Sequence, residues 1–222
     1  MECKGIDEGF DAVVFDMDGV IFDSERLVLK CWEEIAERRG IPDIEEALRE
    51  NLGVNAVQTR ENMLRRYGAD FPYEDFRKEA SMLFHERYDD GRLPLKPGVV
   101  EILEELRRRK VKVALASSTR KAVVEQELRD AGILHYFEKV ICGDMVERSK
   151  PAPDIFLKAC EELGVEPGRS YAIEDSYNGV RSAHGAGMRP IMVPDLSEPT
   201  EEMERLTVAI LPDLLVVMDY LT

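Results

Sequence analysis

Short apolar runs that end in polar residues recur along the chain. They span residues 12–15, 111–116, 140–142, 171–173 and 190–193, and most are followed at once by acidic or hydroxyl side chains. Continuous apolar runs of this length are typical of strands that are buried on both faces of a parallel sheet. We therefore predict that these runs are the strands of a parallel sheet.

Several segments between these runs have the pattern of amphipathic helices. In residues 99–110 the apolar side chains recur three and four positions apart, with acidic residues early and basic residues late, as the helix dipole favours. Residues 153–163 begin with proline and aspartate and end before Gly164, which are helix start and stop signals. Strands alternating with helices predict an α/β fold with helices on both faces of the sheet.

One connection is far longer than a crossover helix requires. About a hundred residues separate Asp18 from Ser117, whereas a crossover between parallel strands needs little more than about a dozen. The excess, residues 24–91, has helical patterns and no convincing strand. We therefore predict a core made of residues 10–23 and 92–222, with a helical module inserted after the first strand.

Three stretches of the inserted module have a helical pattern. In the first, Leu27, Cys31 and Ile35 fall on one face, as expected for a helix that packs against others. Two more stretches, residues 62–67 and 76–88, are predicted to be further helices of the module.

The charge of the chain limits its partners. The formal net charge of −15 over 222 residues opposes binding to nucleic acid or to anionic lipid, because both require clustered lysine and arginine. A phosphorylated substrate is also repelled at long range by this charge. A cation or a local basic pocket must therefore receive any such substrate.

Cysteine usage and hydropathy indicate the compartment. The four cysteines are scattered without a CxxC spacing, which favours reduced thiols over a disulfide framework or a zinc site. The first residues are acidic and lack the apolar segment of a signal peptide, and no stretch has the apolar length needed to span a bilayer. We expect a cytoplasmic protein, with a monomer as the default state and no membrane partner.

Polar residues at the strand ends are the candidates for chemistry, because ligands bind beyond the carboxyl ends of an open parallel sheet. With one lysine from a loop before a helix, they are Asp16, Asp18, Ser117, Ser118, Lys150, Glu174 and Asp175. Carboxylates that converge at one edge repel each other unless a cation lies among them. An all-oxygen site with positions for water and phosphate suits Mg²⁺.

These side chains suit phosphoryl transfer. Lys150 adds a positive charge, and Ser117 offers a hydroxyl and a backbone donor for phosphoryl oxygens. A carboxylate such as Asp16 is an established kind of nucleophile for this reaction. A second carboxyl two residues later can protonate the leaving oxygen and then deprotonate water.

Each of these elements has another explanation when it is taken alone. An Asp-x-Asp sequence at a strand end is common, and the hydroxyls of Ser117 to Thr119 can cap the following helix. Lys150 can be an ordinary solvated lysine, and Glu174 with Asp175 can be an acidic pair in a loop. Their order along the chain and their shared placement favour one site.

Four motifs resemble those of the haloacid dehalogenase superfamily, and within it the beta-phosphoglucomutase-like phosphatases. They are DMDGV at residues 16–20, Ser117 after its apolar run, SKPAPD at residues 149–154, and IEDS at residues 173–176 with Asn178 and Gly179 following. The resemblance covers almost the whole chain. It implies a Rossmann-like, doubly wound core with a helical cap, in agreement with the separate interpretation of residues 24–91.

The resemblance also implies a division of roles. Asp16 would be the nucleophile that forms a phosphoaspartate, and Asp18 the general acid and base, with Lys150 completing the catalytic set. Mg²⁺ would be held by the Asp16 side chain, the Asp18 carbonyl and Asp175, with Glu174 close by.

The expected substrate is a small phosphorylated metabolite, with a sugar phosphate as the leading class. Contacts to the phosphate and the substrate are expected from Gly19, Ser117, Ser118 and Asn178 in the core, and from Ser24 and Glu25 in the cap. The two cap residues are predicted to contact the substrate because they lie close to the first motif in the sequence.

The same resemblance separates several activities. Dehalogenases of this superfamily lack the second aspartate, since a halide leaves without a proton, so Asp18 argues against dehalogenation. Phosphoglucomutases carry a cap histidine just after the first motif and a cap arginine for the second phosphate. This chain has Val28 and Ala56 at the aligned positions, which favours a phosphatase, with a hexose-phosphate mutase as the alternative.

Two alternatives of other classes remain. A phospho-acceptor regulatory domain also has a doubly wound sheet and an acidic metal pocket, but such domains are much shorter and their aspartate does not follow the first strand. A non-catalytic binding protein is compatible with the fold, because fold does not dictate function. Its mark would be a lost nucleophile, and Asp16 is intact.

Overall fold

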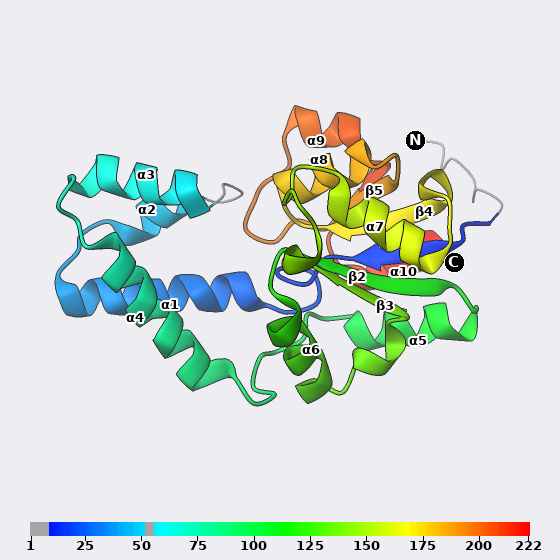
Figure 1. The fold of residues 1–222 in the computed structure, drawn as a ribbon, viewed down its shortest axis with the longest axis horizontal. Coiled ribbons are helices and arrows are strands. Elements are labelled where there is room, and N and C mark those ends of the chain that lie inside the picture. Colours follow the sequence, from blue (N-terminus) through cyan, green and yellow to red (C-terminus); the bar gives the residue numbers. More distant parts are fainter. Residues whose placement is uncertain (1–8, 52–55) are drawn as a thin grey trace. The chain divides into compact units, whose positions relative to one another are not determined.

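The computed structural model describes residues 9–51 and 56–222, which divide into two compact units. The first unit comprises the chain up to Phe22 and from Leu95 onward, and it contains the strands (Figure 1). The second unit, Asp23–Pro94, is helical in its described residues. The sequence-based boundaries of the inserted module, 24 and 91, lie within this second unit.

The first unit is built on a six-stranded parallel sheet with the order β3-β2-β1-β4-β5-β6. The strands are β1 (Ala12–Phe15), β2 (Lys112–Ser117), β3 (Lys139–Cys142), β4 (Ser170–Glu174), β5 (Arg189–Met192) and β6 (Ala209–Ile210). The chain proceeds from β1 to one side of the sheet and then returns to the other side at β4. The predicted parallel α/β fold is confirmed. Open sheets of this kind bind ligands where the strand order reverses, which here is between β1 and β4.

The register of the strands places the polar residues that follow β1, β2 and β4 side by side at the carboxyl edge of the sheet. Phe15 lies opposite Leu115 of β2 and Ile173 of β4, and all residues of β1 are fully buried. The next backbone N–H, that of Asp16, donates to the carbonyl of Ile173 at 2.9 Å. Residues that follow these paired positions therefore share the carboxyl edge of the sheet.

Helices cover both faces of this sheet, with α7 and α8 on one side and α5 and α6 on the other (Figure 1). The helices are α5 (Val99–Arg108), α6 (Lys121–Asp130), α7 (Asp154–Leu163), α8 (Tyr177–Gly185), α9 (Glu201–Leu206) and α10 (Leu214–Leu221). Three short 3-10 turns are η1 (Leu134–Tyr136), η2 (Gly143–Met145) and η3 (Pro167–Arg169). Buried α7 residues, including Phe156, join Val14 and Ala116 in one core cluster, which ties the helix layer to the strands.

The second unit has its own apolar core. Its helices are α1 (Ser24–Arg39), α2 (Ile44–Arg49), α3 (Ala56–Tyr67) and α4 (Tyr73–Tyr88). The predicted inward face of Leu27, Cys31 and Ile35 is buried. The stretches predicted at residues 62–67 and 76–88 are helical, but α3 and α4 begin earlier, and α2 was not predicted.

The described cysteines are free thiols. Cys31, Cys142 and Cys160 are buried and form no disulfide, while Cys3 lies outside the described residues. Burial raises the pKa of Cys142 and of Cys160 to about 11, so both thiols are protonated at neutral pH. Within the described part of the chain, no helix combines the length and the apolar character needed to cross a membrane.

Candidate active site

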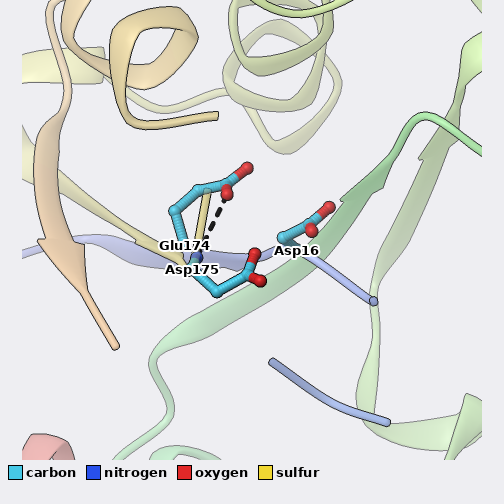
Figure 2. Close-up of side chains that lie close together, drawn as sticks. All are labelled: Asp16, Glu174 and Asp175. Carbon is cyan, nitrogen blue, oxygen red and sulfur yellow. Dashed lines mark hydrogen bonds between the residues drawn. The ribbon is translucent and has the colours of Figure 1, made fainter. Parts of the chain in front are cut away.

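Three buried acidic side chains meet at the carboxyl ends of β1 and β4 (Figure 2). Asp16 follows β1, Glu174 is the last residue of β4, and Asp175 comes next. One carboxylate oxygen from each lies within 4.8 Å of the others, and the three residues are at most 8% exposed. Oxygen ligands this close, and shielded from water, have the composition of a site for a hard divalent cation.

Lys150 connects this acidic cluster to β2. Its Nζ donates to Asp16 Oδ1 and to Glu174 Oε1, each at 2.6 Å, and to the carbonyl of Ala116 at 2.9 Å. The side chain is 7% exposed. Burial alone would lower the pKa of Lys150, but the adjacent carboxylates outweigh it and hold that pKa above its usual value. A protonated ammonium is thus fixed beside the Asp16 carboxylate.

Glu174 is held within the protein through both of its oxygens. Oε1 accepts from Lys150, and Oε2 accepts from the backbone N–H groups of Asp175 and Ser176 and from the Ser176 hydroxyl, at 3.0–3.3 Å. Burial raises the pKa of Glu174 to about 7, with Lys150 opposing this effect and Asp16 adding to it. Glu174 therefore fixes the lysine and the turn from β4 into α8.

Two glycines allow the carboxylates to approach the backbone this closely. A Cβ on Gly179 would lie 1.9 Å from the carboxyl carbon of Glu174, and one on Gly19 would lie 2.2 Å from Asp175 Oδ2. Gly19 also has a φ of 78°, which other residues rarely adopt, and its N–H donates to the carbonyl of Phe22. The packing role of both glycines was missed from the sequence, and the predicted substrate contact of Gly19 stays a prediction.

The turn after β2 places a row of hydroxyls at the same edge. Ser117 is buried and its Oγ accepts from the N–H of Thr119 at 3.1 Å, while Ser118 is exposed. The Thr119 hydroxyl donates to Asp18 Oδ2 at 3.3 Å. The alternative that these hydroxyls cap the following helix is wrong, because Arg120 is the N-cap residue of α6 and makes no side-chain cap.

The remaining predicted residues have other neighbours. Asn178 lies in the first turn of α8, where its Oδ1 accepts from Arg181 at 3.3 Å. Ser24 and Glu25 are the first residues of α1 in the helical unit, with Ser24 buried and Glu25 partly exposed. Contacts of these three residues with a substrate stay predictions.

Sequence comparison identifies the family. The family model of haloacid dehalogenase-like hydrolases matches residues 10–187. The chain belongs to this family. The resemblance drawn from the four motifs is thereby confirmed, and the acidic cluster with Lys150 lies at the strand ends of a haloacid dehalogenase-like hydrolase.

Proteins similar to this chain include two named as phosphatases and one named as a mutase. The phosphorylated carbohydrates phosphatase of Thermotoga maritima is 34% identical over 82% of this chain and 83% of its own length. The beta-phosphoglucomutase of Bacillus subtilis is also 34% identical, over 80% of each chain. The fructose-1-phosphate phosphatase of Escherichia coli is 29% identical over 84% of this chain and 97% of its own.

Solved structures show the same fold. CbbY of Rhodobacter sphaeroides, determined in complex with phosphate, is 28% identical with a TM-score of 0.69 over 92% of this chain and 95% of the other. A family hydrolase of Entamoeba histolytica is 25% identical with a TM-score of 0.77 over 95% and 99% of the two chains. The Rossmann-like core is thus shared with enzymes of this family.

Proposed function

We propose that this protein is a Mg²⁺-dependent phosphatase that hydrolyses a small phosphorylated sugar through a phosphoaspartate at Asp16. The observation that carries this proposal is the buried contact of Lys150 with Asp16, beside Asp175 and Glu174. The named activities of the phosphatase relatives from Thermotoga maritima and Escherichia coli support the substrate class.

The chain's own residues can perform both halves of the reaction. The Asp16 carboxylate attacks phosphorus, the bond to the leaving alkoxide breaks, and Asp18 donates a proton to that oxygen. Water then attacks phosphorus of the aspartyl phosphate, Asp18 takes the proton of the water, and inorganic phosphate leaves with Asp16 restored. Lys150 offsets negative charge throughout, and the Ser117 hydroxyl can donate to a phosphoryl oxygen.

The residues present fit the expected magnesium ion. Asp16 and Asp175 would hold it, with the Asp18 carbonyl as the further ligand that the family resemblance supplies. Both oxygens of Glu174 already accept hydrogen bonds, so we assign it to holding Lys150. When bound, the ion supplies positive charge that lowers the repulsion between the carboxylates and the phosphate.

A phosphatase is favoured over a mutase by two positions of the helical unit. Val28, on α1, is 37% exposed and stands where the resemblance would place a mutase histidine. Ala56 stands where the arginine for a second phosphate would be; its side chain lies outside the described residues. Neither residue can supply the charge or the proton-bearing group that recognition of a bisphosphate requires.

We expect steady release of inorganic phosphate from one or more sugar phosphates. With β-glucose 1-phosphate and a glucose bisphosphate primer, no glucose 6-phosphate should form. The reason is that water, and not a sugar hydroxyl, should accept the phosphoryl group from Asp16. A panel of sugar phosphates, assayed for phosphate and for isomerised sugar in the same reactions, tests both points. Rapid, primer-dependent isomerisation with little phosphate release would instead assign the mutase activity.

Replacing Lys150 with methionine should lower kcat/KM by about 100-fold, because a charge that opposes the developing phosphoryl charge is removed from a water-poor site. The methionine keeps the length of the side chain. Urea unfolding should show a loss of about 3 kcal/mol, since Asp16 and Glu174 lose their buried counter-charge.

A matched control for this variant is Lys139→Met. Lys139 also pairs with a glutamate, Glu162, but both side chains are more than a third exposed and the Nζ to Oε2 distance is 3.3 Å. Exposed pairs contribute little, so this variant should keep the activity and the stability of the wild type. Near-native turnover of Lys150→Met would contradict the assigned role of Lys150.

The wider setting follows from the same proposal. We infer a cytoplasmic monomer with a small-molecule partner, and the net charge of −15 supports the exclusion of nucleic acid. Ser24 and Glu25 are retained as proposed contributors to substrate choice. Membership of a hydrolase family argues against the phospho-acceptor regulatory domain.

A further inference from the structure

We propose that Ser182 is a positioning residue that holds the turn around Lys150, and with it the ammonium beside Asp16; this inference rests on the proposed role of Lys150. The hydroxyl of Ser182 donates to the carbonyl of Ala152 at 2.6 Å. The N–H of Ala152 donates to the carbonyl of Ser149 at 3.0 Å, which closes the turn that contains Lys150. Ser182 therefore bonds to the residue that closes this turn.

The contact made by Ser182 lies inside the protein. Ser182 is fully buried on α8, and the next residue, Ala183, belongs to the core cluster that includes Phe156 of α7. A hydrogen bond that is shielded from water is stronger than one on the surface. The ion pair of Arg148 with Asp154 also spans the turn, but the Arg148 side chain is 69% exposed, and exposed pairs contribute little. Of these two contacts, that of Ser182 is expected to restrain the turn more.

The helix that carries Ser182 also holds Glu174, the acidic partner of Lys150. Ser176, the N-cap residue of α8, donates its hydroxyl to Glu174 Oε2 at 3.0 Å and accepts from the N–H of Gly179 at 3.1 Å. One helix is thus bonded to Glu174 at its start and to the turn around Lys150 further along. Groups that are held by a helix are placed more precisely than groups held by loops alone. The helix α8 therefore sets the position of both partners of this buried ion pair.

Lys150 needs a fixed backbone because its side chain is long and its acceptors are close. The ammonium lies 2.6 Å from Asp16 Oδ1 and from Glu174 Oε1, at the end of a flexible four-carbon stem. A shift of the turn would lengthen these bonds or force the stem away from its preferred torsions. Since a displacement of about 1 Å at a reacting group can cost about 100-fold in rate, a smaller shift should still be measurable.

Ser182→Ala removes the hydroxyl and adds no bulk. We expect kcat/KM for a sugar phosphate to fall by about 5- to 20-fold, which is less than in Lys150→Met because the charge is displaced and not removed. In a Lys150→Met background the same change should have less than about a twofold effect, because Ser182 acts through Lys150. A loss that is as large in that background as alone would overturn the inference, whereas near-native turnover of Lys150→Met alone would overturn the proposed role of Lys150.

Ser170→Ala is the matched control. Ser170 is also fully buried, and its hydroxyl also donates to a backbone carbonyl, that of Glu166 at 3.0 Å, but it begins β4 at the edge opposite the acidic cluster. Both variants should lower the thermal unfolding midpoint, since each leaves a carbonyl without its hydroxyl donor. Ser170→Ala should keep kcat/KM within about twofold of the wild type. An equal loss of activity in the two variants would contradict the positioning role of Ser182.

The ammonium of Lys150 can also be followed without turnover, by NMR of protein that contains isotope-labelled lysine. The protons of a buried, hydrogen-bonded ammonium exchange slowly with water, and Lys150→Met assigns the signal by its loss. Ser182→Ala should raise this exchange rate by about fivefold or more, and Ser170→Ala should leave it within about twofold, because exchange reports local opening. An unchanged rate in Ser182→Ala would refute the inference, even for a variant that is partly unfolded, because the signal comes from folded molecules.

Discussion

Replacing Asp16 with asparagine is expected to lower phosphate release by about 1,000-fold or more, because an amide oxygen cannot form the acyl phosphate. The change is nearly isosteric, and the amide oxygen can still accept from Lys150, which contacts Asp16 Oδ1 in the wild type. The fold should therefore persist while the nucleophile is lost. Steady-state phosphate release measures the first effect, and circular dichroism with thermal unfolding measures the second.

The covalent intermediate gives a second measurement of the same variant. Wild-type enzyme that is quenched in acid during turnover should carry a phosphoryl group on the peptide that contains Asp16, detectable by mass. The Asp16→Asn variant should carry none. Turnover close to that of the wild type in this variant would refute the phosphoaspartate mechanism.

Asp11→Asn is the matched control, because Asp11 precedes the same strand at its other end. Its carboxylate accepts from Arg169 at 2.8 and 2.9 Å, on the exposed surface. A surface ion pair contributes little, so this variant should retain the activity within about twofold. Comparing Asp16→Asn with Asp11→Asn thus distinguishes the loss of the nucleophile from the general effect of removing a negative charge next to β1.

The edge of the sheet that holds the acidic cluster was predictable because strand ends are local signals. The apolar run of residues 12–15 stops at Asp16, and the run of residues 171–173 is followed by Glu174 and Asp175. In a parallel sheet these ends share one edge whatever the details of the connections. Order along the sequence was therefore enough to place the acidic residues together.

The contacts that define the site were not predictable in the same way, because they join residues that are distant in sequence. The motif around Lys150 assigned the lysine to the site, but it did not indicate that the ammonium lies between Asp16 and Glu174. The need for a glycine at Gly179 depends on a side chain from β4, and the pairing of Thr119 with Asp18 depends on the turn after β2. For the contact between Thr119 and Asp18, the sequence offered no more than a hydroxyl residue two positions after Ser117.

Two of the elements that were missed are short. The strand β6 has two residues that are only partly buried, and α2 has six, so neither extends over enough positions to establish a period. The start of α3 was placed too late because Val57, in its first turn, is 69% exposed and adds no inward apolar position. The start of α4 was also placed too late, although its first residue, Tyr73, is buried.

Exhaustive removal of divalent cations is expected to lower phosphate release by about 1,000-fold or more, because the cluster cannot receive a phosphate without a bound cation. One carboxylate oxygen each of Asp16, Glu174 and Asp175 lies within 4.8 Å of the others, and the ammonium of Lys150 contacts this cluster. One ammonium offsets one negative charge, so a phosphate would meet net repulsion at short range. EDTA treatment followed by gel filtration should abolish activity, and Mg²⁺ should restore it.

Asp175→Asn tests whether this cation is held by the acidic cluster itself. Asp175 contacts the backbone at Gly19, and asparagine fits the same space with one charge fewer. We expect the Mg²⁺ concentration for half-maximal activity to rise by about 10-fold or more, because a ligand with full charge is lost.

The thermal unfolding midpoint supplies a readout without turnover: Mg²⁺ should raise it in the wild type and in Asp11→Asn, since an ion that binds only the folded state stabilises it. In Asp175→Asn that rise should shrink at the same Mg²⁺ concentration. Full activity in metal-free enzyme would show that the reaction needs no cation. An equal rise of the unfolding midpoint with Mg²⁺ in all three proteins would show that the cation is not bound at Asp16 and Asp175.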